Sequence, residues 1–149
     1  MAHGKIGSKA KGSEAGFRLT DQQRSLWAKT NMNNDEQRGF WSPLYVHMAD
    51  SANIARYLWN EWLPISERRF IADSVGGDDA TAEALTVWLA GIHDIGKATP
   101  NFQCKVSDRA EVVREMGLEV PSPQMMHGRS HPHAFMSEVI LDKWLSGRG

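Results

Sequence analysis

The pattern of apolar and polar positions predicts a long helix over residues 42–63, which ends before Pro64. Ser42 is a typical N-cap, and Pro43 suits the first helical position. Apolar residues recur at three- or four-residue spacing, as one face of a helix requires. The residues on this inward stripe are Leu44, His47, Ser51, Ile54, Leu58 and Trp62. We therefore expect an amphipathic helix that buries His47.

A second strong helix is predicted over residues 79–94, "DATAEALTVWLAGIHD", with an Asp or Thr residue as its cap. Its apolar residues surround the axis almost completely, which is typical of a buried helix at the centre of a bundle. The helix ends on His93 and Asp94, shortly before Gly96. Because burying an imidazole or a carboxylate is costly unless the group is paired, we expect other side chains to compensate them.

Shorter segments complete the predicted fold. A short capped helix follows Thr20 or Asp21, residues 108–117 form an amphipathic helix that Gly117 ends, and residues 118–133 form a loop. The last helix runs from Pro132 to about Leu145. Its stripe contains His133, Met136 or Ser137, Ile140 and Trp144. No alternating pattern predicts a strand, so the expected fold class is all-α, an irregular bundle of about four to six helices.

Composition changes this picture little. The 149 residues, 41% hydrophobic and 23% charged, fit one domain, which we place at residues 21–149 after a flexible arm at 1–20 that is rich in Gly, Ser and Lys. No signal peptide or membrane span is evident, so we expect a cytoplasmic chain without a membrane partner. The net charge of −1 excludes nucleic-acid binding by bulk charge. The single cysteine, Cys104, excludes an internal disulfide and a cysteine-based zinc site.

Three histidines on different predicted helices are candidate metal ligands. His47, His93 and His133 could converge inside a bundle, with Asp94 adding a carboxylate. A lone inward histidine is most often a hydrogen-bonded core residue, but three beside a carboxylate suit divalent Mn, Fe, Co, Ni or Zn, as one ion or a bridged pair. Lys97 either meets the negative end of the helix dipole or holds a phosphate oxygen.

Six tryptophans raise the question of base stacking. Trp62, Trp88 and Trp144 lie on predicted core stripes, where large aromatic residues are structural. Trp27 and Trp41, near loops, remain the candidates for stacking on bases. The scattered basic residues are expected on a solvated surface rather than in a groove: Lys105, Arg109, Arg114 and Arg129.

The phrase "HDIGK" at the end of an apolar helix, with a histidine on an earlier helix, resembles the HD superfamily of metal-dependent phosphohydrolases. Within it, "LWAKT", "WSPLYVHMADSANIARYLW" and "WLAGIHDIGKATPNFQ" are similar to three signatures of the HD nuclease domain of the CRISPR-associated type I nuclease-helicase. This resemblance covers most of residues 25–106. It implies an all-helical HD-type fold.

The resemblance also implies roles for individual residues. His47, His93 and Asp94 match metal ligands, and Lys97 matches a lysine beside the cleavage site, so Asp94 and Lys97 are the candidate catalytic residues. His133 matches the next histidine of the family, with His127 and His131 as alternatives. The implied activity is metal-dependent hydrolysis of single-stranded DNA in type I CRISPR interference. The implied partners are a helicase part and a CRISPR RNA-guided surveillance complex.

Two departures from the family pattern leave alternatives open. The family's later histidine and aspartate ligands do not appear before Gly149, and no G-x-x-x-x-G-K-[ST] loop is present, so we expect an N-terminal fragment that is incomplete at its C-terminus. One alternative is an HD-type nucleotide phosphohydrolase, which a small, closed and basic pocket would favour. The other is a non-catalytic, truncated HD-fold module, because losing a ligand weakens metal binding.

Overall fold

The computed structural model describes residues 18–31, 39–122, 125 and 131–147. In chain order its elements are α1 (Asp21–Ser25), β1 (Trp27–Thr30), β2 (Trp41–Pro43), α2 (Leu44–Glu61), α3 (Ile65–Ser74), α4 (Asp79–Ile92), the 3₁₀ helix η2 (Ile95–Ala98), α5 (Pro100–Gln103), α6 (Ser107–Glu115) and α7 (His133–Ser146). Helices dominate, which confirms the predicted fold class. The predicted arm lies outside the described residues except for residues 18–20, where Thr20 caps α1.

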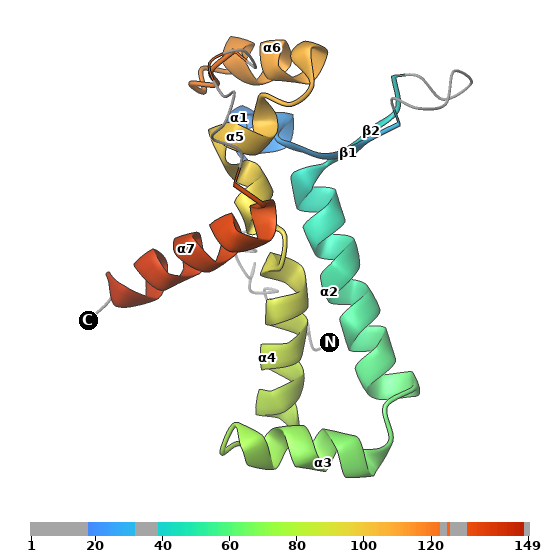
Figure 1. Ribbon diagram of the computed structural model, residues 1–149. Helices are drawn as coiled ribbons and strands as arrows, with labels where there is room; N and C mark the ends of the chain where they lie inside the picture. Colours follow the sequence, from blue (N-terminus) through green and yellow to red (C-terminus); the bar gives the residue numbers. More distant parts are fainter. Residues whose placement is uncertain (1–17, 32–38, 123–124, 126–130, 148–149) are drawn as a thin grey trace, which may run out of the picture.

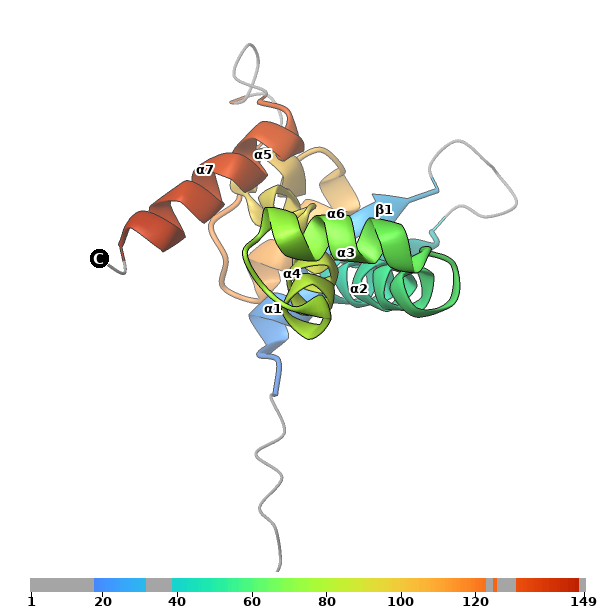
Figure 2. The same ribbon diagram turned by 90° about the horizontal axis from the view of Figure 1, so that it is seen from below.

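The two long helices α2 and α4 lie side by side, and α3 crosses beneath both (Figures 1 and 2). Small residues let the two helices approach closely, because a Cβ atom on Gly91 would lie 3.3 Å from the Cβ of Ala52. Trp59 is 1% exposed and packs with Ala72 of α3 and Ala82 of α4. The close approach at Gly91 places the C-terminal end of α4, where the His93–Asp94 doublet (the HD doublet) begins, beside α2.

The predicted inward stripe of α2 is correct only for the first half of the helix. Leu44 is buried and His47 is partly buried, whereas Ile54, Leu58 and Trp62 are exposed. The buried face in the second half passes instead through alanines to Trp59. The prediction was wrong there because it followed the largest apolar side chains, while close helix packing against Gly91 requires small ones.

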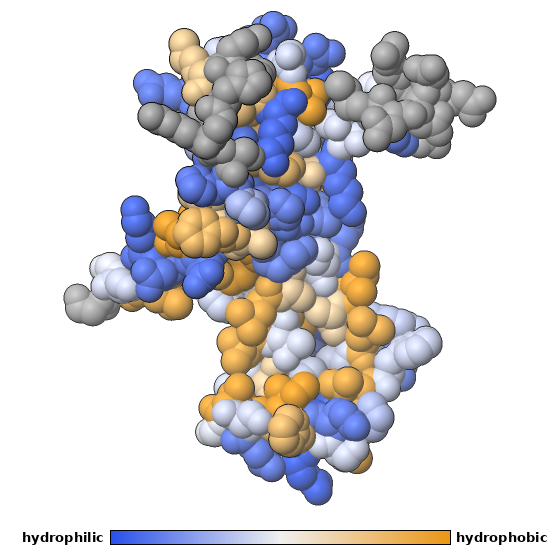
Figure 3. All heavy atoms as spheres, in the orientation of Figure 1, coloured by the Kyte–Doolittle hydropathy of each residue, from blue (hydrophilic) through white to orange (hydrophobic). Residues whose placement is uncertain are grey.

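Among the described residues, other elements cover only part of the α4 surface, contrary to the prediction of a central buried helix. Leu85, Trp88 and Leu89 are exposed, since α2 and α3 cover only part of its surface. Apolar side chains are visible at the surface over α2, α3 and α4 and along α7 (Figure 3). Trp88 and Trp144 therefore lie on exposed faces rather than in a core, with ring centroids 6.3 Å apart.

An antiparallel two-stranded ribbon, β1–β2, was not predicted. It pairs Trp27 with Pro43 and Thr30 with Trp41. Strands of four and three residues are too short to show an alternating pattern. Ser42 and Pro43 belong to β2, so Pro43 takes the N-cap position of α2, and the predicted cap at Ser42 is wrong.

A second core lies beneath the ribbon and around α5 and α6. Trp27 packs against Phe102 with ring centroids 4.6 Å apart, and Val113 of α6 is fully buried. Trp27 is thus a core residue, which removes it as a candidate for base stacking. Gly117 ends α6 with φ +85°, as its position in the sequence predicted.

In the part of the chain that the structure describes, no helix is both long and apolar enough to cross a bilayer.

Candidate metal centre

Four separate structural positions bring their side chains to Asp94. Asp94 follows the C-cap of α4, is the N-cap of η2, and is 6% exposed. His93 is the C-cap of α4, His47 lies in the first turn of α2, and Lys97 lies within η2. His133 is the first residue of α7. The convergence predicted from the sequence is therefore present in the structure.

The contacts to Asp94 are short and come from several directions. Its Oδ2 atom lies 2.7 Å from His47 Nε2 and 2.8 Å from Lys97 Nζ. The same oxygen lies 3.1 Å from His93 Nε2, and Oδ1 lies 3.2 Å from His133 Nε2. The carboxylate is the common partner of three imidazoles and one ammonium group.

Neighbouring polar groups compensate the cost of burying Asp94. Burial by itself raises the pKa of this carboxyl group, but the hydrogen bonds from Lys97 and His47, together with the charges of Lys97 and His93, outweigh that effect and hold the pKa below its ordinary value of 3.8. Asp94 is therefore an anion at neutral pH. The pairing of the His93–Asp94 doublet that the sequence led us to expect is therefore present for Asp94.

The orientation of His93 fits a metal ligand. Its Nδ1 donates a hydrogen bond to the Ala90 carbonyl oxygen at 2.8 Å, so in the neutral ring Nε2 carries a lone pair. That lone pair lies 3.1 Å from the carboxylate oxygen of Asp94, a contact that is favourable only with a positive charge between the two atoms. A bound metal ion would supply this charge.

The donor set matches the chemistry of divalent transition metals. One ligand atom from each of His47, His93 and Asp94 lies within 4.8 Å of the others. Two imidazole nitrogens and a carboxylate oxygen suit zinc and its neighbours among the transition metals. The residues present thus fit a metal ion, although they do not select one.

A close backbone contact fixes α7, and with it His133, against η2. The Gly96 N–H donates to Ser137 Oγ at 2.9 Å, and Ser137 Oγ contacts the carbonyl oxygens of His93 and His133 at 2.8 and 3.1 Å. Ser137 is buried, so it is the inward member of the predicted Met136 or Ser137 pair. Its hydroxyl group joins the doublet to the helix that carries His133.

Gln103 is a buried positioning residue that sequence reasoning missed. Its side-chain amide donates to the carbonyl oxygens of Trp27 and Lys97 at 2.9 and 2.7 Å, and its Oε1 accepts from the Trp27 N–H at 3.2 Å. These bonds tie β1 to η2 beside the centre. A glutamine in the quoted "PNFQ" stretch was the available signal, but burial of a polar side chain is visible only in the tertiary structure.

The structure distinguishes His133 from His131, one of the two alternative histidines. His131 is exposed, and its ring lies beside Phe135 with centroids 5.8 Å apart. His127 lies outside the described residues. Among the described residues of this end of the chain, His133 is the histidine that contacts Asp94, in agreement with its predicted place on the inward stripe of the last helix.

Comparisons with known proteins found one family model and two curated relatives, which share one family name. A family model described as "Cas3, HD domain" matches residues 27–149. A "CRISPR-associated nuclease/helicase Cas3" of Streptococcus thermophilus is 39% identical over 81 residues, which are 52% of this chain and 8% of that protein. A "CRISPR-associated endonuclease/helicase Cas3" of Thermus thermophilus is 30% identical over 125 residues, 84% of this chain and 12% of that protein. The chain thus spans only a small fraction of the length of these relatives, and no solved structure matches it.

Proposed function

Because this chain belongs to the Cas3 HD domain family, as an HD nuclease domain associated with CRISPR systems, we propose that it provides the metal centre for hydrolysis of single-stranded DNA in type I CRISPR interference. The observation that carries the proposal is the convergence of His47, His93, Lys97 and His133 on Asp94. Such a cluster of charged and ligating groups is typical of a functional site rather than of a core.

Each residue has a proposed part in the reaction. His47, His93 and Asp94 hold the metal, and His133 completes the ligand set or contacts the strand. When bound, one or two ions such as Mn, Fe, Co, Ni or Zn activate water and offset the charge on the phosphate. The ion pair with Asp94 holds the ammonium group of Lys97 at the centre. From this position Lys97 binds an oxygen of a phosphate group that approaches the same residues.

The exposure of the centre favours a polymeric substrate. The side chains of His93 and His133 are 47% and 40% exposed, so both imidazole rings are partly open to solvent at the edge of the centre. A strand of DNA reaches such a site without entering a cavity. A nucleotide phosphohydrolase would be expected to enclose its small substrate, which makes this alternative the weaker one.

Metal binding and cleavage test the proposal together. We expect the purified chain to bind Mn²⁺, Co²⁺ or Ni²⁺ in calorimetric titrations and to cleave circular single-stranded DNA in their presence. Asp94→Ala removes the shared carboxylate and is expected to lower metal affinity and to abolish cleavage. Asp50→Ala, on an exposed part of α2, is the matched control and is expected to change neither.

The possible outcomes separate the candidate functions. Cleavage that survives in Asp94→Ala contradicts the proposed role of this residue. Hydrolysis of nucleotides without cleavage of circular DNA favours the nucleotide phosphohydrolase. Metal binding without either activity favours the non-catalytic module.

The proposed function also implies partner proteins and a cellular location. We propose that residues 21–149 act with the helicase part of a longer nuclease-helicase and with a CRISPR RNA-guided surveillance complex. Activity on such DNA places the chain in the cytoplasm. Cleavage assays with and without an added helicase part test whether these residues need it.

A further inference from the structure

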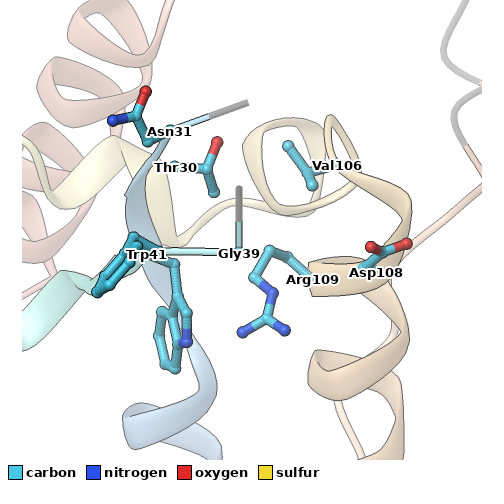
Figure 4. Close-up of a pocket in the computed structure, with 8 residues that line it drawn as sticks. Thr30, Asn31, Gly39, Trp41, Val106, Asp108 and Arg109 are labelled. Carbon is cyan, nitrogen blue, oxygen red and sulfur yellow. The ribbon is translucent and has the colours of Figure 1, made fainter. Parts of the chain in front are cut away.

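The outer end of the β1–β2 ribbon borders two adjacent hollows that lie outside the metal centre. The larger, of about 420 Å³, lies between the ribbon and α6, and its lining includes Phe40, Trp41 and Arg109. Figure 4 labels Trp41 on the ribbon and Arg109 on α6. The second, of about 300 Å³, is also lined by Phe40 and Trp41, and Lys29 borders it. The two aromatic side chains therefore contribute to both hollows.

The chemistry of these side chains suits a flat, unsaturated ligand. Arg109 points toward the indole ring of Trp41 (Figure 4), and its guanidinium carbon lies 4.9 Å from the ring centre. This cation–π contact holds the guanidinium group beside the indole ring. Arg109 therefore lines a pocket, contrary to the expectation of a solvated surface. Phe40, beside it, is 71% exposed.

The charges around the hollows favour a base inside and phosphates at the rim. Asp108 also lines the larger pocket, and its carboxylate disfavours a phosphate there. Lys29 borders the other hollow, and Lys105 is exposed next to Val106 of the pocket wall. Aromatic and guanidinium planes flanked by lysines are the features that hold single strands without sequence preference.

The pocket is also near the metal centre along the chain. Trp41 begins β2, and His47 lies in the first turn of α2, which follows β2 directly. The rise of three residues in a strand and three in a helix limits the separation of their Cα atoms to about 15 Å. One strand of a few nucleotides is long enough to contact both places.

We propose that Phe40, Trp41 and Arg109 form a stacking site for the bases of single-stranded DNA, beside the metal centre and independent of metal. The choice of DNA rests on the proposed function, whereas the stacking chemistry does not. A base that stacks on Phe40 or on the Arg109 and Trp41 pair would position the neighbouring phosphates before cleavage.

Binding of a fluorescent oligo(dT) strand to the whole chain, measured by anisotropy in the presence of EDTA, tests this site. We expect Phe40→Ala and Arg109→Gln each to weaken binding by about 5- to 150-fold, the range for loss of one stacked base. Trp41→Ala is expected to act likewise, and Trp41→Phe, which keeps an aromatic plane, to retain most of the affinity. Circular dichroism of each variant shows whether it is folded.

Two matched variants provide controls. Trp62→Ala removes an aromatic side chain that is 74% exposed, and Arg69→Gln removes an exposed guanidinium group of α3. Both lie outside the pocket and are expected to leave the affinity for oligo(dT) unchanged.

The proposal is wrong if the parent chain does not bind oligo(dT) at low salt, or if folded Phe40→Ala and Arg109→Gln bind as tightly as the parent. Equal losses in Trp62→Ala would also overturn it, since binding would then not be localised at the ribbon. Failure of the metal proposal has a different signature. It would appear as cleavage by Asp94→Ala, with the binding results unaffected.

Discussion

Replacing Gly96 with alanine tests how tightly α7 is docked on η2. A Cβ atom on Gly96 would lie 2.0 Å from the carbonyl oxygen of His133 and 2.5 Å from the backbone nitrogen of Ser137. Ordinary van der Waals contact begins at 3.4 Å, so the first turn of α7 must retreat by about 1.4 Å. Both obstructing atoms belong to the backbone, and therefore no side-chain rotation relieves the clash.

The expected loss of stability is large for a single methyl group. Overpacking in a well-packed contact costs about 1–3 kcal/mol. Retreat of α7 also breaks the hydrogen bond from the Gly96 N–H to Ser137 Oγ, and an unpaired buried donor costs about 1–3 kcal/mol. Alanine's advantage in a helix, about 1 kcal/mol, offsets part of this. We therefore expect Gly96→Ala to lower the free energy of unfolding by about 1–5 kcal/mol.

Urea unfolding followed by far-ultraviolet circular dichroism measures this loss. Gly91→Ala is the matched control, because its Cβ atom would lie 3.3 Å from the Ala52 Cβ and requires an adjustment of only a few tenths of an ångström. Its helix propensity gain, up to about 1 kcal/mol, compensates for that adjustment. A loss below about 1 kcal/mol in Gly96→Ala, or equal losses in both variants, would refute the tight docking of α7.

Three further changes have definite expected outcomes. Ser137→Ala deletes the hydroxyl group that joins η2 to α7 and should lower the free energy of unfolding in urea by about 1–3 kcal/mol, and an unchanged value would contradict this docking role. Gln103→Ala leaves backbone groups of Trp27 and Lys97 unpaired in the core, so denaturant titration should show a loss above about 2 kcal/mol. Because the folded-state pKa of Asp94 is below 3.8, its ionised form stabilises the metal-free fold above pH 3.8, and this contribution should disappear as pH falls through the folded pKa. Between pH 5 and pH 2 the free energy of unfolding of the parent chain should therefore fall more steeply than that of Asp94→Asn. Parallel curves for the two proteins would exclude the effect.

The candidate metal site was largely predictable from local sequence patterns. A histidine and an aspartate at the end of an apolar helix require partners, and the spacing of His47 and His133 on their own helices placed both on inward stripes. These signals are local, because helix periodicity and caps involve residues within a few positions of one another. They identified the residues that meet at Asp94 without indicating which atoms would touch.

Sequence alone determined the helical class, the approximate extent of the main helices and the candidate metal ligands, because each depends on neighbours along the chain. Only the tertiary structure decided that Trp59 is buried while Trp62 is exposed, and that Trp27 is core while Trp41 borders a pocket. It also revealed the β1–β2 ribbon and the contact of α7 with Gly96. Burial and pairing of this kind depend on which distant segment packs against each surface, and that partner leaves no periodic signal in the segment itself.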